Sequence, residues 1–442
     1  MGPVVDLVES DEMLPERVAV MIIGGGIIGV SAALFLARKG VSVALCEKGI
    51  IAGEQSSRNW GWVRQLGRDL RELELARHSL GLWGGLNEEI GADTGFRRMG
   101  LFSATNDPKL IAFWEDWMTK AREQQVHVEL LTGAELEARV PGRAEKFKAG
   151  LWCPSDERAE PSMAAPAIAE AARRLGATIH QDCAARGLET AGGKVSAVVT
   201  ERGTIRTDVA LCAGGAWASM FCRRHGISFA QAGVFATACR TEPAPEVTLG
   251  GIGSPGFSIR RREDGGYTLA MSGRGRVELT PQGIRYATRF LPLYYIRRQK
   301  LKLGLGRSFF EGPEAVANWR FDAESPFERI RVLDPEPDMV LVEEAIGKLR
   351  AAYPVLGQIK VAEAWGGFID VTPDELPVIS AVDPLPGFYL AAGFSGHGFG
   401  VGPAAGRLAA DLVAGDTPTT DPKPFRYSRM VDGSRLWPGT YM

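Results

Sequence analysis

Val18-Ala-Val-Met-Ile-Ile-Gly24-Gly25-Gly26-Ile-Ile-Gly29 is the stretch that decides the fold of this chain. An apolar run follows it to Gly40, and a second run from Val41 ends in Cys46-Glu47-Lys48. This order predicts a buried strand, a glycine turn, a helix and a second strand. Gly24, Gly26 and Gly29 have the spacing of a dinucleotide-binding fingerprint, in which the glycines allow a tight turn, the approach of a pyrophosphate and close helix–strand packing.

Two other interpretations of this stretch compete with nucleotide binding. Residues 18–37 carry no charged side chain, and about 20 apolar residues are enough to cross a membrane. A glycine turn can also be purely structural. Because three glycines interrupt the run, and glycine is a poor helix former, a buried strand and helix explain it better. The helix N-terminus then faces phosphates, and Glu47 can accept hydrogen bonds from a ribose.

Composition narrows the class of protein. The 442 residues suggest two to three domains, and 45% hydrophobic with 24% charged residues is typical of soluble globular proteins. The formal net charge of −2 predicts no nucleic-acid partner. Six cysteines and five histidines are scattered, which predicts reduced thiols and no metal site. The acidic N-terminus lacks a secretory pattern, so we expect a cytoplasmic protein.

The pattern changes along the chain in a way that predicts two interleaved domains. The fold class we expect is α/β, with a Rossmann-type nucleotide domain and a discontinuous α+β substrate domain built on an antiparallel sheet. Asp264-Gly265-Gly266 is a hairpin signal inside the second domain. We expect the nucleotide domain at 17–99, 146–225 and 360–442, the substrate or lid domain at 100–145 and 226–359, and a loosely held arm at 1–16.

Periodicity and turn residues place the individual elements. Thr132 with Glu135 predicts a capping box at one helix start. Expected helices lie at 68–86, 108–125, 132–139, 162–175, 340–352 and 404–414. Expected strands lie at 100–105, 177–183, 194–201, 204–212, 257–261, 267–271, 360–365 and 386–392, and a turn-rich segment follows from Gly366.

Three glycine turns follow expected strands, at 24–29, 213–215 and 396–402. If these strands belong to one sheet, the three turns converge at one edge. The last turn places a second helix N-terminus, from Pro403 onward, beside the ligand. A helix N-terminus stabilises negative charge, which suits a reduced flavin and is not needed by a nicotinamide ring.

Four motifs together resemble a known family. They are Ile23 to Gly29 with Glu47-Lys48, Ala213-Gly-Gly-Ala-Trp217, Thr372-Pro373-Asp374, and Gly393-Phe-Ser-Gly396-His397-Gly398-Phe399-Gly400. The chain, from about 17 to 415, resembles the FAD-dependent amino-acid and amine oxidoreductases, a family that includes D-amino-acid dehydrogenase, glycine oxidase and monomeric sarcosine oxidase. The resemblance implies FAD in an extended pose beneath a lid formed by the substrate domain.

The resemblance also implies which residues contact FAD. In the sarcosine oxidase branch a cysteine links the flavin, and Gly367 occupies that position here, so the FAD is expected to be non-covalent. The arginine and lysine that hold the substrate carboxylate in two branches correspond to Ile369 and Gly400 in this chain. The cofactor-binding residues we expect are Gly24, Gly26, Ile27, Ile28, Gly29, Glu47, Lys48, Ser56, Ser57, Arg58, Asn59, Trp60, Ala185, Ala213, Gly214, Trp217, Gly367, Gly396, His397, Gly398, Phe399 and Gly400.

Four residues are candidates for contact with the substrate. Arg64 aligns with the carboxylate-holding arginine of the sarcosine oxidase branch, and a guanidinium binds a carboxylate through two parallel hydrogen bonds; a structural or flavin-side ion pair is the alternative. Tyr267 and Arg274, with Arg276 nearby, are pocket candidates, against a solvated hairpin. His397 is a candidate for the cofactor loop, for a catalytic base or for packing.

The resulting hypothesis is oxidation of an amino acid, with a D-amino acid favoured. Hydride passes from Cα to flavin N5, and the imine hydrolyses to a keto acid. Oxidation or demethylation of an N-substituted amino acid, and a nicotinamide-dependent dehydrogenase, are the alternatives. The electron acceptor can be O₂, a quinone or an electron carrier. Residues 290–302 mix apolar and basic side chains, which predicts either peripheral contact with the inner face of a membrane or an ordinary amphipathic lid segment.

Overall fold

The computed structural model describes residues 2–439, and its first sheet has six strands. The order is β21, β22, β13, β1, β2, β9, parallel throughout except for the edge pair β21–β22. The bounds are β1 Val20–Ile23, β2 Val43–Cys46, β9 Thr178–His180, β13 Ala210–Cys212, β21 Val378–Ala381 and β22 Phe388–Ala392. The strands that precede the three glycine turns, β1, β13 and β22, are neighbours, so the turns converge as expected.

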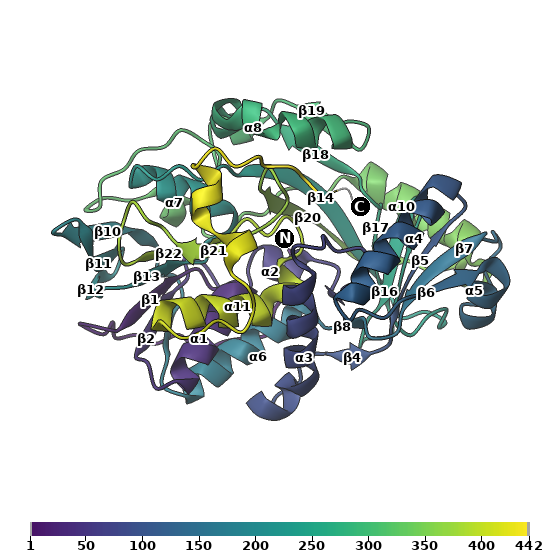
Figure 1. Cartoon of the computed structure of the whole chain (residues 1–442), viewed down its shortest axis with the longest axis horizontal. Helices are drawn as coiled ribbons and strands as arrows, with labels where there is room; N and C mark the ends of the chain where they lie inside the picture. The colour runs from purple at the N-terminus through teal and green to yellow at the C-terminus, as the bar shows by residue number, and fades with distance from the viewer. Residues whose placement is uncertain (1, 440–442) are drawn as a thin grey trace.

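Helices cover one face of this sheet, where α1, α11, α3 and α6 lie close together (Figure 1). The apolar stretch 18–37 is therefore a buried strand followed by a buried helix. A Cβ on Gly402 of α11 would lie 2.6 Å from the Ile27 side chain of α1, so this glycine lets α11 pack directly on α1. The bounds are α1 Ile27–Arg38, α3 Leu73–Ile90, α6 Pro161–Arg174 and α11 Gly398–Ala414; α2 spans Gln55–Arg58 and α7 Ala218–Arg224.

The second sheet has ten strands and carries the substrate domain. The path is β19, β18, β14, β17, β16, β15, β5, β7, β6, and β20 pairs with β14. The Asp264 hairpin joins the antiparallel pair β16–β17 as predicted. The bounds are β5 Leu101–Thr105, β6 Glu129–Thr132, β7 Ala149–Cys153, β14 Ala232–Thr241, β15 Gly251–Ser254, β16 Phe257–Arg261, β17 Tyr267–Ala270, β18 Gly275–Glu278, β19 Leu301–Gly304 and β20 Val361–Val371.

Two small sheets and the remaining helices complete the chain. The predicted capping box is present: Thr132 Oγ1 accepts from Glu135 N, and the Glu135 carboxylate accepts from Thr132 N at 2.7 Å. The small sheets are β10 Ala185–Ala191, β11 Lys194–Thr200 and β12 Gly203–Arg206, and β3 Trp62–Val63, β8 Glu157–Arg158 and β4 Arg97–Arg98. The other helices are α4 Pro108–Glu123, α5 Gly133–Arg139, α8 Pro281–Arg297, α9 Pro326–Arg329 and α10 Met339–Ala352. The α/β fold class is confirmed.

Several expected boundaries were wrong. β7 and β20 lie within the ranges expected for the nucleotide domain, but both pair in the large sheet. The strand expected to end at Trp365 continues through Gly366 as part of β20. A Cβ on Gly366 would lie 2.2 Å from the Pro335 carbonyl oxygen, so the glycine lets these two segments pass close together and does not form a turn. The strand expected at 204–212 is two strands in different sheets, β12 and β13.

Helix starts also differ from the sequence prediction. α11 begins at Gly398, so Pro403 lies inside the helix, although proline favours the first helical position. Its glycines are poor helix formers, but close packing against β3 and α1 compensates. α3 begins at Leu73, five residues later than expected. The arm 1–16 is not loosely held where the structure describes it, because Asp6 N donates to Ser162 O and Asp11 N to Ile179 O.

Candidate functional site

A cavity of about 990 Å³ is lined by residues of both large sheets. One end lies at the carboxyl ends of β1, β2 and β13, where ligands bind in open α/β sheets. The other end lies against β5, β14 and β20 of the second sheet. All of the expected cofactor residues line it except Gly29 and Ser57. Their roles remain predictions, but the structure brings them to one place.

The first glycine turn leaves no room for side chains. Gly24 has a φ of +110°, and a Cβ there would lie 2.5 Å from the Ala213 carbonyl oxygen. A Cβ on Gly29 would lie 2.0 Å from the Gly24 carbonyl oxygen. The N-cap residue of α1, Gly26, has no side chain to cap the helix, and Ser56 Oγ instead accepts a hydrogen bond from Ile27 N at 2.9 Å. This glycine cradle fits a pyrophosphate at the start of α1.

Glu47 lies at the end of β2 with its carboxylate held by the backbone. Its two oxygens accept from Gly25 N at 2.7 Å and from Gly49 N at 2.8 Å. Burial raises the pKa of Glu47. Beside it, Lys48 Nζ donates to Glu54 at 2.6 Å and lies over the Trp217 ring. An acceptor at the end of the second strand fits the ribose of the adenosine half of FAD.

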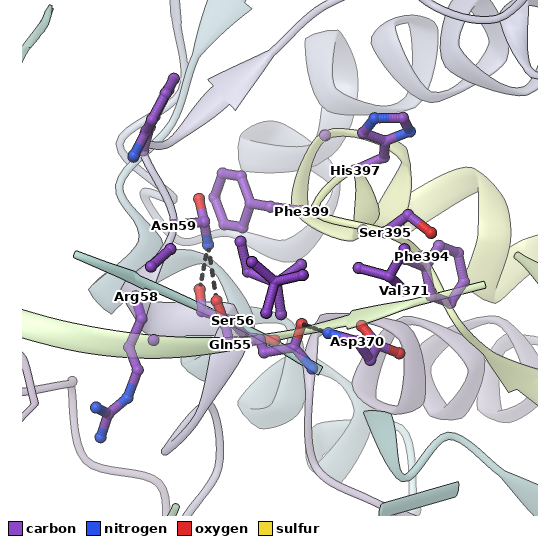
Figure 2. A pocket seen from close by; sticks show the side chains of 18 of the residues that line it. Gln55, Ser56, Arg58, Asn59, Asp370, Val371, Phe394, Ser395, His397 and Phe399 are labelled. Atoms are coloured by element: carbon purple, nitrogen blue, oxygen red, sulfur yellow. Dashed lines mark hydrogen bonds between the residues drawn. The ribbon is translucent and has the colours of Figure 1, made fainter. Parts of the chain in front are cut away.

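The segment 55–59 forms one wall of the cavity (Figure 2). Asn59 Nδ2 donates to the Ser56 carbonyl oxygen at 2.8 Å, which keeps this short turn closed. Arg58 points away from the centre of the cavity (Figure 2), and its guanidinium donates to Asp334 at 2.6 Å and to Gly366 O at 2.8 Å. Arg58 therefore ties the wall to β20 through its hydrogen bond to Gly366, and its ion pair with Asp334 is almost fully buried on the arginine side.

His397 lies at the N-terminus of α11 and belongs to a cluster of charged side chains. Its Nδ1 lies 2.9 Å from Glu72, which is fully buried. Burial, followed by the charge of Arg68, lowers the pKa of His397, so the ring is neutral at neutral pH. Arg68 is 3% exposed and lines the same cavity. This arrangement orients the His397 ring at the cavity wall.

Glu72 and Arg68 were missed by the sequence interpretation, which treated 68–86 as a plain amphipathic helix. A signal was present: Glu72 lies three and four residues before Leu75 and Ala76, on the stripe that is buried in α3. A charged residue on an apolar stripe is costly to bury unless it is paired. Such a position indicates a functional or structural partner.

Arg64 follows β3 and lines the cavity together with Arg68. Its guanidinium lies over the Trp62 ring, 5.2 Å from the centroid, and donates to Leu66 O at 3.2 Å. Burial and the charge of Arg68 lower the pKa of Arg64 to about 9, so the side chain remains a cation at neutral pH. The charge of Arg64 also acts on His397. Arg64 thus places a cation near the α11 end of the cavity.

The two candidate substrate residues from the lid domain, Tyr267 and Arg274, do not line the cavity. Tyr267 is fully buried in the core of the second sheet, where its hydroxyl donates to Pro245 O at 2.9 Å and accepts from Val247 N. Arg274 is exposed and does not line the cavity; Arg276 is exposed and pairs with Glu278. Tyr267 therefore points into the core of the second sheet and does not line the cavity.

Asp370, near the end of β20, is a buried carboxyl group in the cavity wall. It accepts from Gly393 N at 2.8 Å and from Gln231 Nε2 at 2.9 Å. Burial outweighs these hydrogen bonds and raises the pKa of Asp370 to about 6. The hydrogen bonds join β20 to the turn after β22, so this group positions the third glycine turn.

Asp370 is expected to make the protein less stable as pH rises from about 4 to about 6. Between the unfolded pKa of 3.8 and the folded pKa of about 6, the native state keeps the proton that the unfolded state loses. The free energy of unfolding then falls by about 3 kcal/mol through this group. Asp370→Asn, which cannot titrate, should lack this component when urea unfolding is compared with the unmutated protein across that range. Identical pH profiles would contradict the assignment.

Potential metal ligands do not cluster in the described part of the chain. Within residues 2–439, no group of three or more histidine, cysteine, aspartate or glutamate side chains could hold a metal ion. All six cysteines are buried free thiols. In the same residues, no helix has both the length and the apolar composition needed to span a bilayer.

The chain is similar to known proteins over most of its length. The family model described as "DAO: FAD dependent oxidoreductase" matches residues 19–412. The structure is similar to L-amino acid deaminase from Proteus myxofaciens, solved with anthranilate, with a TM-score of 0.92, 30% identity and 97% of each chain covered. Sarcosine oxidase subunit beta from an Arthrobacter species is 24% identical over 94% of this chain and 91% of its own length.

A third relative, D-amino acid dehydrogenase from Vibrio cholerae, is 24% identical over 79% of this chain and 71% of its own. Several other relatives are longer, and the chain spans only 41–45% of their length. The family match covers most of the chain, and the glycine cradle, Glu47 and the cavity fit the cofactor that the family uses. The chain belongs to the DAO family of FAD-dependent oxidoreductases.

Proposed function

We propose that this FAD-dependent oxidoreductase oxidises a free amino acid at the carbon that bears the amine. The observation that carries the proposal is Arg64, a cation in the cavity wall beside Trp62 and Arg68. A guanidinium binds a carboxylate through two charge-assisted hydrogen bonds. The similarity to amino-acid and amine oxidoreductases over most of the chain supports the same substrate class.

Each part of the cavity has a distinct task in this proposal. Arg64 holds the substrate carboxylate, and Trp60 and Trp62 keep water away from the amine end. The neutral His397, oriented by Glu72, keeps a proton acceptor near the amine. The start of α11 supplies a positive dipole end where negative charge develops. Bound FAD would accept the two electrons and the Cα hydrogen, and water would hydrolyse the resulting imine to a keto acid.

The proposed chirality of the substrate is supported by the similarity in structure. The deaminase similar to this chain over 97% of its length is specific by name for L-amino acids. An L-amino acid is therefore the first candidate, although the sequence favoured a D-amino acid. The D-amino acid is the second candidate, supported by a shorter match. An N-methyl amino acid is the third, supported by the sarcosine oxidase subunit.

FAD attachment is proposed to be non-covalent. Gly367 lines the cavity on β20, at the position where a branch of the family carries its linking cysteine. Cys46 and Cys212 also line the cavity, but they end β2 and β13 at the nucleotide end. Acid precipitation should release all of the yellow colour into the supernatant. The electron acceptor, whether O₂, a quinone or a carrier, stays a prediction.

Arg64→Ala is expected to raise KM for amino-acid substrates by about 10- to 100-fold, since a hydrogen-bonded charge contributes about 1.5–3 kcal/mol. FAD content should not change, because Arg64 lies away from the nucleotide end. Arg64→Lys keeps the positive charge but not the two parallel N–H donors of the guanidinium, so it should recover part of the substrate affinity that Arg64→Ala loses. Steady-state kinetics with flavin quantification measures both. An unchanged KM for every carboxylate substrate would remove Arg64 from this role.

A further inference from the structure

One surface of the molecule concentrates exposed apolar side chains. We name residues 279–310 the apolar–basic face; it comprises α8, β19 and the 3₁₀ turn Arg307–Phe309. α8 and β19 form the upper edge of the molecule (Figure 1). Of the 22 large apolar side chains exposed among the described residues, nine lie here: Leu279, Ile284, Leu291, Tyr294, Tyr295, Ile296, Leu303, Leu305 and Phe310. Large exposed apolar patches mark interaction sites.

The apolar side chains of α8 point outward. Ile284, Leu291 and Tyr295 are spaced seven and four residues apart, so they share one side of the helix. The buried residues of α8 are Gln282, Tyr286 and Leu293. A helix at a water-exposed surface normally has a polar outer side. In α8 the outer side is apolar, which favours a partner that accepts apolar groups.

The charge of this face is entirely positive. Residues 279–310 contain seven arginines and lysines and no aspartate or glutamate, although the whole chain has a formal net charge of −2. Five of the seven are exposed: Arg285, Arg298, Lys300, Lys302 and Arg307. Apolar side chains flanked by basic ones are typical of helices that lie in the headgroup region of an anionic bilayer.

We propose that the apolar–basic face docks on the surface of a lipid bilayer that contains anionic lipids. A symmetric contact with a second copy would bring five exposed positive charges against five, which is unfavourable. With Arg285 and Arg289 inside its 17 residues, α8 suits the plane of the interface and not a span. β19 is the edge strand of its sheet and adds Leu303 beside it.

The face adjoins the cavity. Leu293, Arg297, Lys300 and Leu301 belong to α8, β19 and the link between them, and all four line the cavity. Docking would bring that side of the cavity to the membrane, where a lipid-soluble electron acceptor could reach it. The docking proposal does not rest on the proposed substrate, because binding to vesicles is measured without turnover.

Co-sedimentation of the FAD-loaded protein with phosphatidylcholine vesicles, with and without phosphatidylserine, tests the docking. The protein should sediment with the phosphatidylserine vesicles, and high salt should weaken this binding. The triple variant Arg285→Gln, Arg298→Gln, Lys302→Gln should bind about 100-fold more weakly, since each removed charge lowers the partition roughly fivefold. The matched control, Lys109→Gln, Lys146→Gln, Lys194→Gln, removes three exposed charges elsewhere and should lower the partition much less.

A second triple variant tests the apolar contribution. Ile284→Ser, Tyr295→Ser and Phe310→Ser change only exposed side chains that do not line the cavity, so folding should persist. Its partition should also fall at least tenfold. Absence of binding to anionic vesicles, or equal binding by all three variants, would overturn the proposal. A dimer in sedimentation velocity that the apolar variant disrupts would assign the face to a second copy instead.

Discussion

Gly24→Ala is expected to lose bound FAD, with a flavin affinity at least about 100-fold lower than that of the unmutated protein. Gly24 has a φ of +110°, a conformation that costs an alanine roughly 1–3 kcal/mol. The added Cβ would also lie 2.5 Å from the Ala213 carbonyl oxygen, so β1 and β13 must separate where the pyrophosphate binds. Absorbance in the flavin bands and titration of the apoprotein with FAD measure the effect.

Gly40→Ala is the matched control for Gly24→Ala. Gly40 also has a positive φ, +72°, but nothing lies within 4 Å of a Cβ added there. It follows α1 at the end far from the cavity, and it does not line it. This variant should lose some stability from backbone strain but retain FAD. Full flavin content in Gly24→Ala, with an intact fold by circular dichroism, would show that the cradle does not bind the cofactor.

Arg260→Met is expected to lower the free energy of unfolding by about 3–5 kcal/mol, because it removes the guanidinium that binds both oxygens of the buried Glu160 carboxylate and leaves it only the more distant charges of Arg158 and Arg262, each 3.8 Å away. Arg260 is fully buried, and its guanidinium donates to both oxygens of Glu160, at 2.7 and 3.1 Å. It also donates to Trp60 O and to Thr268, so it joins the cavity wall to the second sheet. Urea unfolding of the FAD-loaded protein measures the loss.

The double variant Arg260→Met, Glu160→Met distinguishes the destabilisation caused by removing one partner from the net contribution of the ion pair to the free energy of unfolding. It should recover much of the lost stability, since neither member of the pair then remains as a buried charge. Arg320→Ala breaks a surface ion pair with Asp322 and should leave the unfolding midpoint unchanged. If Arg260→Met behaves like Arg320→Ala, the buried pair does not stabilise this interface.

The nucleotide half of the molecule could be predicted because its signals are local. The spacing of Gly24, Gly26 and Gly29, the strand before them and Glu47 after them lie within 30 residues. The need for glycine at these positions follows from steric limits on the backbone, which hold for any sequence that forms this turn. The boundaries of β20 and α11 could not be predicted in this way. Their glycines resemble turn residues, and only packing against Pro335 and Ile27 shows why a strand and a helix persist.

The substrate half was less predictable because its residues come together only in the fold. Arg64 was found through a resemblance, and Glu72 and Arg68 were not found, although their partner His397 was named. Glu72 and His397 are separated by 325 positions in the sequence. Tyr267 and Arg274 were chosen from strand positions in the lid, but the alternation of a strand does not show which side faces a cavity that two sheets share.

Anaerobic flavin bleaching tests the central claim most directly. The purified protein would be mixed without oxygen with a panel of L-, D- and N-methyl amino acids while the flavin bands are followed. We expect a yellow protein that bleaches with at least one class, L-amino acids first, and bleaches with that class only at much higher concentration in Arg64→Ala. A yellow protein that no member of the panel bleaches, or a colourless protein that no added FAD restores, would contradict the account.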